Sequence, residues 1–288
     1  MSLVIEMRGL SKTYGRTKAL NGLNLAVPEG RILGLVGPNG AGKSTALSAM
    51  LGLIPCDGDL RVLGRDPWRD RERVMQDVSF IADVAVIPRW LTVSQALNYF
   101  SGVHPRFNRA RAEHFLARTR VEPRHKVREL STGTITQLNL ALVMAIGARL
   151  LVLDEPTLGL DILVRKQFFD SLLTDYFDDT RTIIIATHQV DEVQDVLSDV
   201  AFIDNGSVVL ESSMDDFASR YLEVRVRPEH VTAGRALQPM RERAALGRTV
   251  MLFDTVPRER LTPLGDVRTP GLADLYVAIM TPRTGAAA

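Results

Sequence analysis

The chain has 288 residues, enough for one large domain with an appendage or for two domains that each bury a core. Apolar residues make up 45% and charged residues 24%, a composition that excludes a disordered or fibrous protein. The 35 basic and 34 acidic residues leave a net charge of +1, so no global field favours nucleic acid or an acidic partner. The single cysteine, Cys56, excludes an intrachain disulfide and favours a reducing compartment.

The sequence contains no signal for secretion or membrane insertion. Its N-terminus lacks a basic segment followed by an apolar run and a cleavage site, and no stretch approaches 18 consecutive apolar residues. We therefore expect the protein in the cytoplasm, with any membrane spanned by another polypeptide.

The first third of the chain predicts strands that lead into a glycine-rich loop. Residues 4–7 and 23–27 alternate as short strands, and 31–36 form an apolar, buried strand. A helix at 45–51 and a strand at 60–63 follow. From about residue 84 to 130 the pattern becomes polar and helical, which predicts an inserted helical subdomain.

The middle of the chain alternates helices and strands as a largely parallel sheet does. Ser131 is the expected N-cap of a helix that ends at Gly147, and strands at 150–153 and 182–186 flank a helix at 162–177. Asn205-Gly206 predicts a two-residue hairpin.

Beyond residue 216 the alternation lapses into strands at 222–226 and 250–253 and a helix at 272–280. We therefore divide the chain into residues 1–215 and a small α+β C-terminal domain, 216–288, whose role no residue indicates.

A phosphate-binding loop is the strongest motif. Residues 37–44 read GPNGAGKS and fit the P-loop (Walker A) pattern between a strand and a helix, the context that the pattern requires. Glycines let successive backbone N–H groups point inward, and the helix N-terminus adds positive charge. Lys43 is expected to reach the outer phosphates of ATP and Ser44 to bind Mg²⁺. The nucleotide-binding residues of this loop are Gly37, Pro38, Asn39, Gly40, Ala41, Gly42, Lys43, Ser44 and Thr45.

Two acids end the apolar strand that begins at residue 150. Asp154 at the strand tip can orient the metal, while Glu155 can polarise a water that attacks the terminal phosphate. One acid alone could simply cap a turn, but the loop upstream favours catalysis, with Glu155 as the base.

These motifs and three others resemble the ATP-binding subunits of ATP-binding-cassette (ABC) transporters, from about residue 5 to 211. LSTGT at 130–134 resembles the signature segment of that family, TLGLD at 157–161 its D-loop, and ATH at 186–188 its switch histidine. Tyr14 stands where the family places an aromatic ring that stacks on adenine. The resemblance implies a P-loop NTPase fold with an ABC-type core sheet, an antiparallel β subdomain, an inserted helical subdomain and a C-terminal extension.

The resemblance also implies a mechanism with shared sites. Two such chains, as a homodimer or as paired cassettes, would close on two ATP molecules and hydrolyse them. Ser131 and the N–H group of Gly133 would contact the terminal phosphate held by the other chain's Lys43, Asp161 would couple the two sites, and His188 would hydrogen-bond that phosphate.

Two departures from the family pattern affect expected contacts. Thr132 and Thr134 flank Gly133 where relatives have glycine and glutamine, but the serine and second glycine are kept. Asp83 stands where most relatives have a glutamine that ligates Mg²⁺ and touches the membrane partner. A carboxylate is also a good Mg²⁺ ligand, so the metal ligands expected are Ser44, Asp83 and Asp154.

The partner implied is an integral-membrane permease. The variant motifs and the closing segment at 269–280 resemble ATPases that serve ABC-2-type export permeases, which would place this chain peripherally at the cytoplasmic face of the plasma membrane, touching the membrane only through the permease. Basic residues at 106–128 could be a solvated helix face, or could contact permease helices or anionic lipid.

Two other functions share the same loop. One is a soluble ABC-type ATPase acting on nucleic acid or ribosomes, but the chain lacks the second cassette or long coiled coil usual there, so no nucleic acid is expected. The other is a small-molecule kinase, which leaves LSTGT and His188 unexplained.

Overall fold

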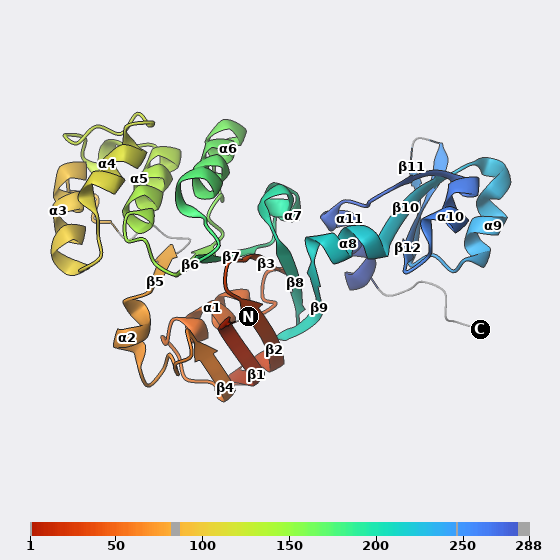
Figure 1. Cartoon of the computed structure of the whole chain (residues 1–288), viewed down its shortest axis with the longest axis horizontal. Helices are drawn as coiled ribbons and strands as arrows, with labels where there is room; N and C mark the ends of the chain where they lie inside the picture. Colours follow the sequence, from red (N-terminus) through yellow and green to blue (C-terminus); the bar gives the residue numbers. More distant parts are fainter. Residues whose placement is uncertain (1, 82–86, 246, 282–288) are drawn as a thin grey trace.

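A six-stranded sheet forms the centre of the molecule (Figure 1). In this computed structural model, which describes residues 2–81, 87–245 and 247–281, the strand order is β5, β6, β7, β3, β8, β9. Every neighbouring pair is parallel except β8 with β9. The carboxyl ends of five strands therefore meet at one edge. The strands are β3 (Ile32–Val36), β5 (Val78–Ile81), β6 (Leu150–Asp154), β7 (Thr182–Thr187), β8 (Asp199–Asp204) and β9 (Ser207–Ser213).

The hairpin expected at Asn205-Gly206 joins β8 to β9. Both residues have positive φ, 46° and 77°, and Asp204 pairs with Ser207 across the turn. Positive φ at both central residues is the geometry that favours Asn-Gly in two-residue hairpins. The prediction is confirmed.

A second, antiparallel sheet has the order β2, β1, β4 (Figure 1). Its strands, β1 (Leu3–Tyr14), β2 (Thr17–Pro28) and β4 (Asp57–Val62), share one apolar core with α1 (Lys43–Met50) and with one face of the central sheet. The first two strands are much longer than the sequence predicted. Register shifts between Met7 and Leu10 and beyond interrupt the period-two alternation on which that prediction relied.

Two helices, α3 (Val93–Val103) and α4 (Arg109–Leu116), form the helical region expected at about 84–130, and α5 (Thr132–Met144), the helix predicted after Ser131, packs beside them. They pack on the other face of the central sheet through the largest apolar core. Thr92 and Gln95 form a reciprocal capping box at the start of α3. Four of the eight lysines and arginines at 106–128 have acidic partners, namely Arg106 with Asp77, Arg109 with Glu113, Arg118 with Asp175, and Arg124 with Glu122. The region is therefore less positive than its sequence suggested.

Helix α6 (Ile162–Ser171) is shorter than the predicted helix at 162–177, and a wider π-helical turn, Leu172–Tyr176, continues it. The Tyr176 side chain is buried, and its hydroxyl donates to the Ala148 carbonyl at 2.9 Å. A buried hydroxyl needs such a partner, which periodicity cannot reveal.

Residues beyond 213 build a third sheet, antiparallel, in the order β11, β12, β10, β13 (Figure 1). It has an apolar core of its own, which includes Val224, Met251 and Phe253. Its elements are α8 (Met214–Arg220), β10 (Tyr221–Val226), α9 (Val231–Ala236), β11 (Arg241–Ala245), β12 (Arg248–Asp254), α10 (Arg258–Leu261) and β13 (Gly265–Arg268).

The helix that follows this sheet, α11 (Leu272–Met280), has the predicted bounds but packs back on the central sheet. Its Leu272 and Leu275 are buried in the largest core, and the Tyr276 ring lies 5.2 Å from the Phe202 ring of β8 in an edge-to-face contact. The remaining helices are α2 (Arg71–Met75) and α7 (Val190–Val193). No described helix has the length and apolar character needed to cross a bilayer.

Candidate nucleotide site

The phosphate-binding loop lies between β3 and α1, at the edge where the parallel strands end. Gly42 is the N-cap of α1 with φ of 107°, and an added Cβ there would lie 2.5 Å from the Ala19 carbonyl oxygen. At Gly37 a Cβ would collide with the Ile203 carbonyl. Glycine is therefore required at both positions, by backbone conformation or by close approach. The loop leaves the N-terminal N–H groups of α1 available to an anion.

Lys43 is the principal cation of the loop. Its side chain is 6% exposed, and its Nζ donates to the carbonyls of Gly37 at 2.7 Å and Pro38 at 3.2 Å. Burial lowers the pKa of the Lys43 ammonium below its ordinary value, while the nearby carboxylates of Glu155 and Asp154 act in the opposite direction. The carbonyl dipoles of Gly37 and Pro38 thus hold the Lys43 ammonium in the loop where the sequence predicts that the outer phosphates of ATP bind.

Glu155 follows β6 directly and faces Lys43, with 4.0 Å between its Oε1 and the lysine Nζ. Its φ is 45°, a conformation that non-glycine residues rarely adopt, and its N–H donates to the Ala186 carbonyl at 2.9 Å. The strain turns the carboxylate toward the end of β7. Asp154, one residue earlier, is the last residue of β6 and half-buried.

The end of β7 supplies two donors to the Glu155 carboxylate and a histidine ring nitrogen within hydrogen-bond distance of it. The Thr187 hydroxyl donates to Oε2 at 2.9 Å, the His188 N–H donates to Oε1 at 3.1 Å, and the His188 Nδ1 lies 2.7 Å from the same oxygen. The structure therefore brings together Lys43, Glu155 and His188, the three residues that the sequence analysis names as catalytic. Thr187 was missed, although its place immediately before the histidine was the available signal.

The other residues predicted to bind the nucleotide or the metal lie in different parts of the structure. Tyr14 ends β1 with its ring 49% exposed and the Lys12 ammonium 5.5 Å from the ring centroid, so one ring face is accessible for stacking. Ser44 is exposed in the first turn of α1. Asp83 lies outside the described residues. Within the described part of the chain, no three His, Cys, Asp or Glu side chains cluster as metal ligands.

Ser131, Gly133 and Asp161 do not join Lys43 but line a separate groove of about 790 Å³. Ser131 caps α5, accepting from the Thr134 N–H at 3.3 Å, and Asp161 caps α6, accepting from the Val164 N–H at 2.9 Å. Arg118 and Arg120 also line the groove. Two helix N-termini and the Arg120 guanidinium bring positive charge to this groove, which suits an anion, while Arg118 is paired with Asp175 and the Asp161 carboxylate offsets part of that charge.

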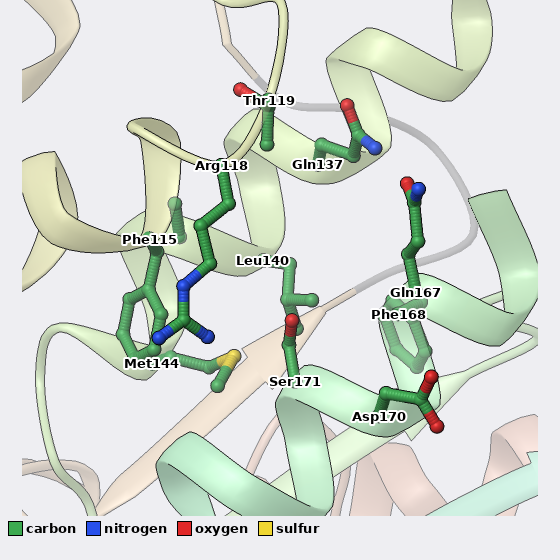
Figure 2. Close-up of a pocket in the computed structure, with 11 residues that line it drawn as sticks. Phe115, Arg118, Thr119, Gln137, Leu140, Met144, Gln167, Phe168, Asp170 and Ser171 are labelled. Atoms are coloured by element: carbon green, nitrogen blue, oxygen red, sulfur yellow. The ribbon is translucent and has the colours of Figure 1, made fainter.

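The groove continues into a smaller pocket of about 230 Å³ between α4, α5 and α6, shown in Figure 2. Phe115, Leu140, Met144 and Phe168 give that pocket an apolar lining, with the Arg118 side chain lying along it (Figure 2). Figure 1 shows that the helices around the groove stand apart from α1, so the two candidate anion sites are distinct in one chain.

Comparison with known proteins gives the class to which this fold and site belong. The family model described as ABC transporter matches residues 20–158. The chain is 33% identical over 218 residues to the daunorubicin resistance ATP-binding protein DrrA3 of Streptomyces coeruleorubidus, covering 74% of this chain and 69% of the relative. It is 26% identical over 223 residues to the ABC transporter ATP-binding protein YtrB of Bacillus subtilis, covering 77% and 76%. Other curated relatives are longer, and the chain spans 38% of one from Escherichia coli.

A solved structure titled as the ATP-binding subunit of an ABC transporter matches with a TM-score of 0.67 at 23% identity, covering 74% of this chain and 91% of that one. The chain belongs to the ABC transporter family, among its ATP-binding subunits. The predicted fold, a P-loop NTPase of ABC type, is confirmed. The alternative of an ATPase acting on nucleic acid or ribosomes gains no support from these relatives.

Proposed function

We propose that this chain binds ATP on residues 37–45 and hydrolyses it to power a separate membrane permease, with Glu155 as the base. The observation that carries the proposal is the placement of the Glu155 carboxylate 4.0 Å from the Lys43 ammonium, where the Thr187 hydroxyl, the His188 N–H and the His188 ring orient it. A general base must be held within reach of its water, and this carboxylate is held beside the cation that would bind the terminal phosphate.

In the proposed step a water oxygen bonds to the terminal phosphorus while the bond from that phosphorus to the bridging oxygen of ADP breaks. The water's proton passes to Glu155. Lys43 and the N-terminal N–H groups of α1 offset the negative charge on the phosphates, and His188 donates to the terminal phosphate. Mg²⁺, which Ser44, Asp154 and Asp83 would hold, supplies further charge neutralisation. Tyr14 stacks on the adenine ring.

The second anion groove supports closure of two chains on ATP. Ser131, Gly133 and Asp161 lie apart from Lys43 in one chain, so they can contribute to a nucleotide only if that nucleotide is bound by another chain. The capped N-terminus of α5 would then face the partner's terminal phosphate. A homodimer, or a pair of similar cassettes, is the assembly that we propose.

As the contact with the permease, we favour an apolar surface of the helical region rather than its basic residues. Trp90, Tyr99 and Val103 are 70%, 60% and 63% exposed, and the last two lie four residues apart on one face of α3. Large apolar side chains exposed in one region suit a protein partner, whereas several arginines of this region already have acidic partners. The chain would lie at the cytoplasmic face of the membrane through this contact.

Export is the direction that we propose, because one relative is named a daunorubicin resistance ATP-binding protein. We also propose that residues 1–215 form the ATP-binding domain, with a helical subdomain at about 84–130, and that residues 216–288 form a second domain. The separate apolar core of the third sheet supports this division, with α11 returning to pack on the core of the first domain.

The test is Mg²⁺-dependent ATP hydrolysis by the purified chain and by Lys43→Ala, which removes the cation from the loop. We expect the variant to lose ATP binding and hydrolysis. Lys166→Ala removes an exposed lysine from α6 and serves as the matched control, with activity unchanged. Equal hydrolysis by Lys43→Ala and the parent would refute the proposed site.

A further inference from the structure

Glu192 joins two segments that the proposed mechanism needs but does not itself connect. It lies on α7, four residues after His188. Its Oε2 accepts from the Thr157 hydroxyl at 2.8 Å, and its Oε1 lies 2.7 Å from the Nη1 of Arg165 on α6. The carboxylate therefore binds the first residue of the 157–161 segment, which contains Asp161, and an arginine four residues beyond the end of that segment.

The arginine extends this connection to the backbone of the segment. Arg165 Nη2 donates to the Leu160 carbonyl at 3.3 Å while its Nη1 holds Glu192. One guanidinium thus fixes the main chain directly before Asp161, and Asp161 in turn caps α6 through the Val164 N–H. Any shift of Glu192 would pass through Thr157 at the start of the segment and through Arg165 at its end.

The hydrogen-bonded network of Thr157, Glu192 and Arg165 is largely buried, so its bonds contribute to the stability of the segment. Thr157 is 2% exposed, and the side chains of Glu192 and Arg165 are 13% and 25% exposed. The Nε of Arg165 is also buried and has no hydrogen-bond partner among the residues that the structure describes. Without the Glu192 carboxylate, the hydroxyl and the guanidinium would lose a shared partner in a poorly hydrated place, which favours a rearrangement of the segment.

Helix α7 is itself fixed on either side of Glu192. Before it, His188 contacts Glu155, and the Gln189 N–H donates to the Thr187 hydroxyl at 3.0 Å. After it, the Gln194 side-chain oxygen accepts from the Leu272 N–H of α11 at 2.6 Å. Contacts thus hold the chain on both sides of Glu192, between the histidine and the 157–161 segment.

We propose that Glu192 is a positioning residue that holds the Thr157–Asp161 segment in register with the Glu155–His188 pair. This inference rests on the proposed ATPase function, in which His188 serves the nucleotide of its own chain and Asp161 contributes to the shared groove. Glu192 then makes the geometry of one site depend on the state of the other. It touches neither phosphate nor water and acts through Thr157 and Arg165.

The experiment compares Glu192→Ala with Asp191→Asn, which removes the charge of the adjacent, exposed acid and serves as the matched control. Steady-state hydrolysis is measured against ATP concentration for both variants and the parent full-length chain. Displacing catalytic groups by about 1 Å can cost on the order of a hundredfold in rate. We expect kcat of Glu192→Ala to fall by about ten- to a hundredfold, with KM for ATP within about twofold of the parent, because the phosphate loop is untouched.

Hydrogen–deuterium exchange provides a readout that does not depend on hydrolysis. Peptides covering residues 157–164 and 186–190 should exchange faster in Glu192→Ala and unchanged in Asp191→Asn, while those covering 37–45 keep the parent's protection. If Glu192→Ala does not fold, Thr157→Val removes only the hydroxyl bond and should reproduce the faster exchange at 157–164.

The outcomes separate the two proposals. A parent chain that does not hydrolyse ATP contradicts the proposed function, and the exchange data still decide whether Glu192 holds the segment. A parent chain that hydrolyses, beside a folded Glu192→Ala with unchanged kcat and unchanged exchange at 157–164, overturns the inference. A rise in KM without a fall in kcat would also overturn it, because it would place Glu192 in ATP binding.

Discussion

Glu155→Gln is the sharpest perturbation of the proposed site, because it keeps the size of the side chain and removes its charge and basicity. The hydrogen bonds around it can be kept. The carboxamide oxygen can accept from the His188 N–H, and the Thr187 hydroxyl can reverse its role and accept from the new amide. The strained backbone at this position does not change. We therefore expect the variant to fold.

The largest loss of folding stability that this substitution can cause is the attraction between the Glu155 carboxylate and the Lys43 ammonium. At 4.0 Å, with an effective dielectric constant of 20, the Coulomb attraction is about 4 kcal/mol. The neutral amide also avoids the cost of desolvating a carboxylate, several kcal/mol, which opposes this loss. The two terms nearly cancel, so the free energy of unfolding should change by no more than about 2 kcal/mol, or a few degrees in Tm for a chain of this size.

The activity change should be much larger. Loss of a positioned base costs roughly a hundredfold or more in hydrolysis rate. With hydrolysis blocked, ATP should stay bound and the variant should elute as a dimer in size-exclusion chromatography with Mg-ATP, and as a monomer without it. Asp191→Asn is again the control, with parental rate and elution. A Glu155→Gln chain that stays monomeric with ATP and hydrolyses it as fast as the parent would refute both the base assignment and the shared site.

Three further predictions concern other parts of the chain. Gly133→Ala should keep the parental Tm, because an added Cβ would make only ordinary van der Waals contacts, but should lower hydrolysis by at least about tenfold if the backbone approaches a partner's phosphate. Unchanged hydrolysis would count against the shared site. Burial raises the pKa of the Cys56 thiol, so less thiolate is present at a given pH and native alkylation by iodoacetamide at pH 8 should be slower than in the denatured chain. Equal rates would contradict this. Glu223→Gln removes the buried negative charge that pairs with Arg243 and Arg268, and should lower the free energy of unfolding, measured in urea, by about 2 kcal/mol. This loss is smaller than for a fully buried ion pair because both arginines are partly exposed. Exposed Glu259→Gln should have no effect, and equal midpoints for the two variants would refute the argument.

The parts of the site that the sequence predicted are those fixed by local chemistry. A glycine-rich loop, an acid at the end of an apolar strand and a serine before a helix each take their geometry from neighbouring residues, and the structure places Lys43, Glu155 and Ser131 accordingly. The alternation of helices and strands predicted the parallel sheet for the same reason.

The parts that were missed depend on pairing across long stretches of chain. Thr157 and Glu192 meet across 35 residues, and neither position carries a periodic or spacing signal that would join them. The π-helical turn after α6 contains Tyr176, whose hydroxyl bonds to Ala148 across 28 residues, and α11 packs in a core built mostly of residues far away in sequence. Propensity and periodicity report on neighbours in sequence, so these contacts could not be derived from them.

The return of α11 to the central sheet affects how the chain is completed during synthesis. Phe202 of β8 gains its aromatic neighbour only after the entire third sheet has been made, because Tyr276 follows that sheet in sequence. Contacts of such long sequence separation form late and slow folding. A nascent chain that ends before α11 would leave apolar surface of β8 uncovered, and a single protease cut between the first and third sheets would leave two fragments still held together by this helix.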